Sequence, residues 1–309
     1  RGADAARILA RLTTTPVTEL SVGENAHGLM LDDAGHVADF ASVTRLSGDL
    51  FLLTTATPAD RRLQLGARGF DAEALNVSGM VAALGVVGPA ARDVVSAAGI
   101  DLLSADATAQ GRVRGVELAI RPISFGAAPG VEIMCPAEEA LVIWERLRRK
   151  RALPAIGLDA LEILRIEGGV PRVGVDFVGA DTTSAPDAKR LPAEIGLPHL
   201  APANRAWFSG RRAMKHAGAG SRRLLTLTID SDEALPGAAV YSKNRAIGRI
   251  TSAAYSPRLR RAVAFAEIEA GSAACDVLEV AAAGPPGRAP AARLETPEGR
   301  LSAAFQKNS

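Results

Sequence analysis

The stretch ILRIEGGVPRVGVDF, residues 163–177, joins an apolar helical run to a glycine-rich turn and carries the acid Glu167 at that joint. Apolar side chains spaced for the buried side of a short helix precede it, namely Leu161, Ile163, Leu164 and Ile166. Two glycines follow, and glycine allows a close approach of backbone. A carboxylate there can accept two N–H bonds from the edge of a 2-aminopyrimidinone. The alternative is a solvated acid, although a helix end of this polarity slightly disfavours negative charge.

The segments before this stretch predict a layered α+β arrangement. Their expected order is helix, strand, buried strand, helix, strand, strand and helix, over residues 2–12, 50–55, 81–88, 89–99, 115–123, 130–135 and 136–150. Pro89 occupies the favoured first position of its helix, and Gly99 closes that helix. Alternation of this kind predicts helices on one face of an antiparallel sheet.

The chain changes character near residue 221. Short β-rich segments separated by turn residues follow, which is typical of a small barrel or sandwich. We therefore expect a new domain to begin between residues 204 and 222. Beyond Ala281 the sequence is rich in Ala, Pro and Gly, which predicts a loosely held tail with at most a short helix.

Composition argues against several classes of function. The 309 residues are 48% hydrophobic and 23% charged, which indicates a folded protein of two or three units. A net charge of +2 gives no support for a nucleic-acid partner. No apolar run approaches the ~20 residues of a membrane-spanning helix, and no signal peptide is visible. The two widely spaced cysteines favour the cytoplasm, and the four histidines lack the spacing of metal ligands.

A second candidate acid lies in LMLDDAGHVADFASV, residues 29–43. Asp32, Asp33 and Gly35 fit a hairpin turn. Asp39 follows with strand alternation among apolar neighbours, so it could be partly shielded from water. A shielded carboxylate can hold a cationic heterocycle or tune a proton transfer. Spacing alone, however, favours an ordinary solvent-facing strand residue.

These segments together resemble a known family. The stretch at 163–177, with LPAEIGLPHL after it, is similar to the turn and pterin-binding segment of the glycine-cleavage T-protein superfamily. Five more stretches fall in the family's order, at residues 9–39, 84–95, 123–136, 204–214 and 248–268. The last of them, GRITSAAYSPRLRRAVAFAEI, resembles part of the family's carboxy-terminal barrel. The similarity runs from about residue 5 to residue 280.

The resemblance implies an α+β fold, a clover-leaf of two ferredoxin-like α+β domains plus a small C-terminal β-barrel. Residues 1–205 would form the folate-binding region, with a second, interleaved subdomain at about 76–155. The barrel would cover 206–281, and 282–309 would be the tail. The resemblance also implies that tetrahydrofolate occupies the central hole.

Individual residues map onto the family's site. Glu167 falls on the pterin-binding acid, and Arg223 or its neighbour Arg222 falls near the basic residue that meets the folate tail. Asp39 falls on the first acid of the family's Asp-Asp pair and is the catalytic candidate, since Phe40 replaces the second acid.

Other positions depart from the family's pattern. Ala56 stands for an Asn, Gly126-Ala127-Ala128 for Thr-Gly-Glu, and Val173 and His27 each for a Tyr. The resemblance therefore implies a tetrahydrofolate-dependent one-carbon transferase or demethylase, acting on a small molecule and not through the glycine-cleavage reaction. The lost positions also motivate an alternative, a non-catalytic folate-binding subunit with a partner protein. A pocket adapted to an unrelated ligand is the third possibility.

Overall fold

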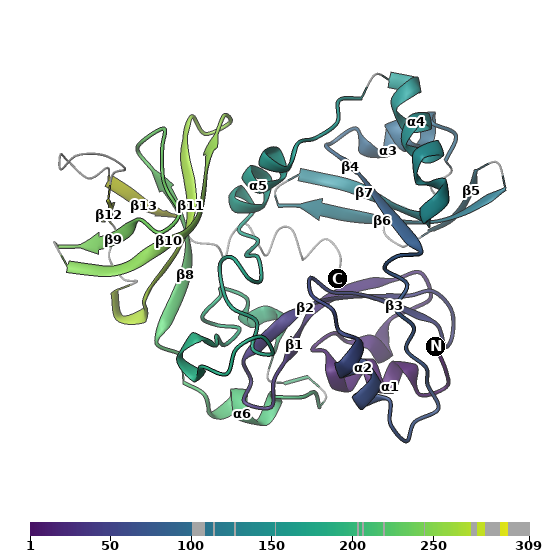
Figure 1. Cartoon of the computed structure of the whole chain (residues 1–309), viewed down its shortest axis with the longest axis horizontal. Helices are drawn as coiled ribbons and strands as arrows, with labels where there is room; N and C mark the ends of the chain where they lie inside the picture. Colours follow the sequence, from purple (N-terminus) through teal and green to yellow (C-terminus); the bar gives the residue numbers. More distant parts are fainter. Residues whose placement is uncertain are drawn as a thin grey trace.

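The computed structural model shows three parts arranged around one central helix, α5 (Leu158–Glu167) (Figure 1). The structure describes residues 1–100, 109–113, 115–126, 128–151, 153–202, 204–205, 207–218, 220–243, 245–272, 277–281 and 291–295. In this part of the chain no helix combines the length and the apolar character needed to cross a membrane.

The first part is a three-stranded antiparallel sheet in the order β1-β2-β3. Its elements are α1 (Ala5–Leu12), η1 (Val17–Glu19), β1 (Asn25–Leu31), β2 (Val37–Arg45), β3 (Phe51–Thr54) and α2 (Asp60–Gly66). Leu9 of α1 and Val43 of β2 share one buried cluster, against which Leu63 of α2 packs. Both helices therefore cover the same face of the sheet and leave the other face to the centre of the molecule.

The second part is a four-stranded antiparallel sheet in the order β4-β7-β6-β5, covered by two helices. Its elements are β4 (Val81–Val87), α3 (Ala91–Ala97), β5 (Ala109–Val113), β6 (Val116–Phe125), β7 (Ala128–Pro136), η2 (Ala137–Glu139) and α4 (Ala140–Arg151). The expectation of a buried strand at 81–88 is wrong. β4 is an edge strand, and Val81 is 37% exposed although Leu84 packs against the core.

The third part is a closed barrel in the order β10-β11-β8-β13-β12-β9. Its elements are β8 (Arg222–Ile229), β9 (Ala239–Ser242), β10 (Arg245–Ser256), β11 (Arg261–Glu269), η5 (Ala270–Ser272), β12 (Val277–Val280) and β13 (Ala291–Glu295). β13 lies in the stretch expected to be a tail, so the barrel extends past Ala281. Residues 282–290 and 296–309 lie outside the described residues. Two α+β parts and a small barrel confirm the predicted fold class.

A long connection joins these parts and builds the junction between them. It contains α5, η3 (Pro186–Ala188), η4 (Pro198–Leu200) and α6 (Arg211–His216). One buried cluster takes in Leu29 from β1, Ile166 from α5 and Leu224 from β8, so the first part and the barrel share a core through α5. We call this set the junction cluster.

Candidate functional site

The end of α5 is closed by a Schellman motif that fixes the position of Glu167. The Val170 N–H donates to the Arg165 carbonyl at 2.9 Å, and the Gly169 N–H donates to the Ile166 carbonyl at 3.0 Å. Gly169 has φ of +67°, which glycine adopts without steric cost. The second glycine of the Gly-Gly pair therefore ends the helix between Ile166 of the junction cluster and Val170, which packs against that cluster.

Glu167 is buried against the barrel, and its side chain is only 4% exposed. The Arg258 Nε donates to its Oε2 at 2.8 Å, and the Ser256 hydroxyl donates to its Oε1. A solvated helix-end acid, the alternative from the sequence, is therefore wrong. The apolar side chains before it are less buried than expected, because only Ile166 and Glu167 of α5 are fully buried.

Asp176 is a second buried acid from the same stretch, and no local pattern of residues singles it out. Its side chain is fully buried. The Thr251 and Ser252 hydroxyls of β10 donate to its Oδ1, the former at 2.7 Å. Arg165 Nη1 and the Arg172 N–H donate to its Oδ2 at 2.7 and 2.8 Å. Thr251 and Ser252 of β10 thus bind Asp176, and Ser256 at the end of the same strand binds Glu167.

Two neighbouring acids, Glu162 and Asp176, stabilise the charged form of Arg165. Burial opposes that charge, yet hydrogen bonding to Glu162 and the proximity of Asp176 raise the pKa of Arg165. The hydrogen bond from Arg165 in turn lowers the pKa of Glu162, against the effect of burial. Arg172 Nη1 also lies 3.0 Å from Glu162. This charged network fixes the turn after α5 against the barrel.

Asp39 is also buried, but its carboxylate is used to hold a loop. The Thr57 N–H and hydroxyl donate to Oδ2 at 2.7 and 2.6 Å. The Phe40 and Ala56 N–H groups donate to Oδ1 at 2.7 and 3.3 Å. Asp39 pairs across the sheet with Met30, which packs with Ala59 on the α2 side of the sheet.

Phe40 faces the opposite side of β2, because neighbouring strand residues alternate between faces. It packs against the junction cluster and meets Phe177 edge to face, with ring centroids 6.0 Å apart. The structure therefore does not bring Asp39 together with Glu167. Of the neighbours Asp39 and Phe40, it is the apolar Phe40 that faces the centre of the molecule.

Further along the same face of β2, a polar group connects the two sheets. Arg121 of β6 donates to the Ser42 and Thr44 hydroxyls at 3.2 Å each and pairs with Glu132 at 2.5 Å. His27 lies opposite Ser42 in the β1–β2 ladder. Burial, assisted by the positive charge of Arg121, lowers the pKa of His27 to about 4. His27 is thus neutral at physiological pH.

Arg222 and Arg223 begin β8 and point to opposite faces of it. Glu194 anchors this start, since its Oε1 accepts the Ser221 and Arg222 N–H groups at 2.8 and 3.0 Å. Arg222 shares its face with Leu224 of the junction cluster, whereas Arg223 shares its face with Leu227 of the barrel core. Of the two predicted arginines, Arg222 is the one on the junction side.

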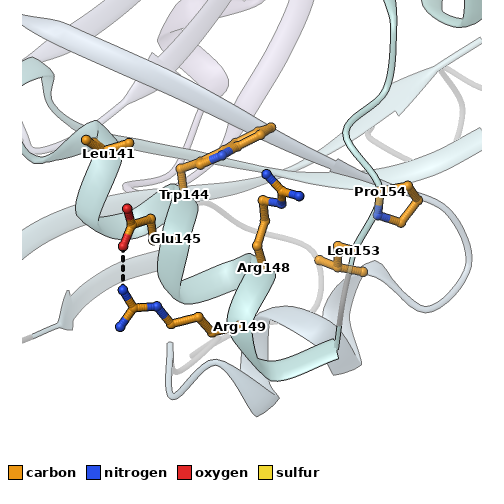
Figure 2. Close-up of a pocket in the computed structure, with 7 residues that line it drawn as sticks. All are labelled: Leu141, Trp144, Glu145, Arg148, Arg149, Leu153 and Pro154. Carbon is orange, nitrogen blue, oxygen red and sulfur yellow. Dashed lines mark hydrogen bonds and ion pairs between the residues drawn. The ribbon is translucent and has the colours of Figure 1, made fainter.

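A hollow of about 700 Å³ lies elsewhere, on the outer side of α4 (Figure 2). Trp144 and Arg148 border it, with the guanidinium carbon 5.8 Å from the ring centroid. None of the predicted site residues lines it. The described residues also contain no group of three or more His, Cys, Asp or Glu suited to a metal ion. The buried acids at the end of α5 and in the turn after it are therefore the candidate functional site.

Comparison with known families gives two matches that follow the division of the fold. The GCVT N-terminal domain matches residues 1–190, and the glycine cleavage T-protein C-terminal barrel domain matches residues 222–297.

Individual relatives agree with these matches. A "Probable aminomethyltransferase" of Haloarcula marismortui is 31% identical, over 89% of this chain and 77% of its own length. An aminomethyltransferase of Deinococcus deserti is 27% identical, over 96% and 81%. Rat mitochondrial dimethylglycine dehydrogenase is 27% identical, over 87% of this chain but 32% of the enzyme.

The fold also matches a solved structure, that of the glycine cleavage system aminomethyltransferase T from Bartonella henselae. The TM-score is 0.83 with 21% identity, over 97% of this chain and 82% of the other. At this identity the likeness shows the shared fold.

Proposed function

Because the chain belongs to the glycine-cleavage T-protein family, we propose that it is a tetrahydrofolate-dependent one-carbon transferase or demethylase. Its substrate would be a small molecule in the cytoplasm rather than the aminomethyl-lipoyl carrier of glycine cleavage. The observation that carries the proposal is the buried Glu167 carboxylate, which accepts a hydrogen bond at each oxygen from Ser256 and Arg258.

The chemistry of this carboxylate fits the pterin ring. A 2-amino-4-oxo heterocycle presents two parallel N–H donors, which suit a carboxylate that can accept on both oxygens. Gly168 and Gly169 add no side chain between the helix end and a flat ring. Arg222, on the junction side of β8, would neutralise the carboxylates of the folate tail, and Arg223 stays the other candidate. Tetrahydrofolate, when bound, supplies a nitrogen nucleophile that accepts the one-carbon unit.

The chain's own residues would bind and orient the folate at this site. Glu167 fixes the ring edge, and Phe40 with Phe177 presents apolar surface on the side of β2 toward the junction cluster. A catalytic role for Asp39 stays a prediction. It would require the carboxylate to leave its Thr57 and Ala56 donors and to reach the other face of β2.

Ligand-induced stabilisation tests folate binding directly. Tetrahydrofolate at about 100 times its Kd would stabilise the native state by about 2.7 kcal/mol and raise the Tm. We expect this rise in the wild type and in Asp159→Asn, which changes an exposed acid at the other end of α5. Glu167→Gln should lose most of it, because an amide cannot accept both N–H donors. Absence of a rise in the wild type at millimolar folate would refute the proposal.

A second candidate function is a non-catalytic, folate-binding subunit of a larger complex. The position of Asp39 favours it, since this acid holds the loop at residues 56–57 and Phe40 takes the central face. Purified chain should be incubated with tetrahydrofolate and a panel of aminomethyl and methyl donors, and folate products measured by mass spectrometry. One-carbon folate formed by the lone, monomeric chain excludes the accessory role; folate binding without product on any donor supports it.

A further inference from the structure

The loop that reaches Glu167 is a short hairpin between β10 and β11. Ser256 and Arg261 pair across the two strands and enclose residues 257–260. The Arg260 N–H donates to the Ser256 carbonyl at 2.7 Å, and the Leu259 N–H donates to the Ser256 hydroxyl oxygen at 3.0 Å. Arg260 itself has φ of +53°. These bonds set the loop so that the Arg258 side chain lies over the end of α5.

The two barrel residues that donate to Glu167 differ greatly in exposure. Ser256 is fully buried, whereas the Arg258 side chain is 56% exposed. The Glu167 side chain is 4% exposed, so a ligand that pairs with its Oε2 has to take the place of the Arg258 donor. Arg258 can exchange its bond to Oε2 for water with little steric hindrance. Ser256 cannot, because it lies in the core and also holds Leu259.

We infer that Arg258 is a displaceable counter-ion that sets the affinity and specificity of the Glu167 site for ligands with two adjacent N–H donors. The inference rests on the folate site proposed above. Arg258 competes with the ligand for the carboxylate, so every ligand must replace a charge-assisted hydrogen bond.

The competition selects for the number of donors on the ligand. A two-donor edge replaces the Arg258 bond and adds a second, so the exchange is favourable. A ligand with one donor only replaces the charge-assisted bond from Arg258. The buried Glu167 carboxylate then accepts a weaker hydrogen bond than it did before the ligand bound. Arg258 thereby acts against one-donor rings more strongly than against pterins. It is a specificity-determining residue, and it carries out no bond-making step.

The test is the dissociation constant of two probes, measured by calorimetry. The probes are tetrahydrofolate and its 2-desamino analogue, which lacks one N–H donor. We expect Arg258→Ala to bind tetrahydrofolate about fivefold more tightly, as suits a half-exposed ion pair. The analogue should gain more than this, so that discrimination between the probes falls. Arg260→Gly removes the same charge from the same loop at a position suited to glycine, and should change neither constant.

The possible results separate the two proposals. Weaker binding of tetrahydrofolate to Arg258→Ala would show that Arg258 contacts the ligand. Unchanged dissociation constants for both probes would show that Arg258 does not compete with the ligand for Glu167. Either result overturns this inference and leaves the folate site standing. Binding by the variant alone would support the blocking role of Arg258 and refute folate binding by the natural chain. No binding by either protein overturns both. Arg258→Gln repeats the comparison with a side chain of similar reach, should alanine disturb the loop.

Discussion

Asp39 and Phe40 are neighbours in sequence, yet they serve opposite faces of β2. Alternation along the strand turns the acid toward the loop at residues 56–57 and the aromatic ring toward the junction cluster. The family resemblance aligned Asp39 with an acid of a catalytic pair, but only the direction of its side chain decides what it can reach. In this chain that direction gives the Asp39 carboxylate four hydrogen-bond donors from residues 40, 56 and 57.

We expect Asp39→Asn to lower the free energy of unfolding by about 2 kcal/mol or more, because an amide leaves N–H donors of the loop without an acceptor. Urea unfolding measures the loss. Asp33→Asn, an exposed position in the β1–β2 turn, is the matched control and should be near neutral. A variant of normal stability that has lost one-carbon transfer would instead assign Asp39 to catalysis.

His27 makes stability depend on pH in a defined window. Its pKa falls from 6.5 to about 4 in the folded protein through burial and Arg121. The unfolded chain therefore takes up the proton first as pH falls, and stability present above pH 6.5 is lost toward pH 4. At about 1.4 kcal/mol per unit, the loss approaches 3 kcal/mol.

The measurement is urea unfolding of the wild type and His27→Gln between pH 4 and pH 7. The stability difference between the two proteins should change by that amount across the window. His216→Gln, an exposed histidine on α6, controls for general effects of acid. A difference that stays constant with pH would contradict the assignment.

The sequence could identify Glu167 but not Asp176, for a physical reason. Glu167 is a lone charge at the end of an apolar helical run, and that local contrast is visible in one stretch. Asp176 is set apart only by its partners Thr251 and Ser252, which lie 75 and 76 residues away. Likewise, the sequence could name Arg222 and Arg223 together, but only the strand's orientation separates them.

At the scale of elements, the β6–β7 hairpin touches the end of α5. A Cβ added to Gly126 would lie 1.9 Å from the Leu164 carbonyl oxygen, so only glycine allows this approach. Gly126 also has φ of +60°. The second sheet thus supports the helix end that carries Glu167. Ala127, the next residue of this replaced motif, lies outside the described residues.

Gly126→Ala and Gly174→Ala separate backbone strain from steric contact. Both glycines have positive φ, but nothing lies within 4 Å of a Cβ at Gly174. We expect Gly174→Ala to cost about 1 kcal/mol and Gly126→Ala at least about 2 kcal/mol more, since the clash is with backbone. Urea midpoints give both values. Equal losses at the two positions would mean that the hairpin does not press on α5.

Element boundaries were less predictable than element types. Periodicity located the β6–β7 pair and the helix after it, because each has a strong local pattern. The apolar run of β4 predicted burial, but such a run does not reveal that the strand lies at the edge of its sheet. β13 was missed because its composition, AARLE, carries no β signal of its own. Its strand conformation comes from pairing with β8 and β12.

At the scale of the whole molecule, β13 closes the barrel between β8 and β12. We expect a chain ending at residue 290 to unfold at lower temperature than one ending at residue 295, because its barrel exposes two unpaired strand edges. Size exclusion should also show association of the shorter chain. Identical Tm values for the two chains would show that β13 adds nothing to the barrel.

The acids of residues 163–177 have a consequence for how this protein is made. The hydroxyls and guanidinium of β10 and its loop that satisfy Glu167 and Asp176 lie 75 to 91 residues further along the chain. At ribosomal speed that is a delay on the order of ten seconds, during which both carboxylates must stay hydrated. The helix end cannot settle into its final place before the barrel emerges from the ribosome. Burial of both acids is thereby timed by translation, and a nascent chain that stalls early keeps them in water.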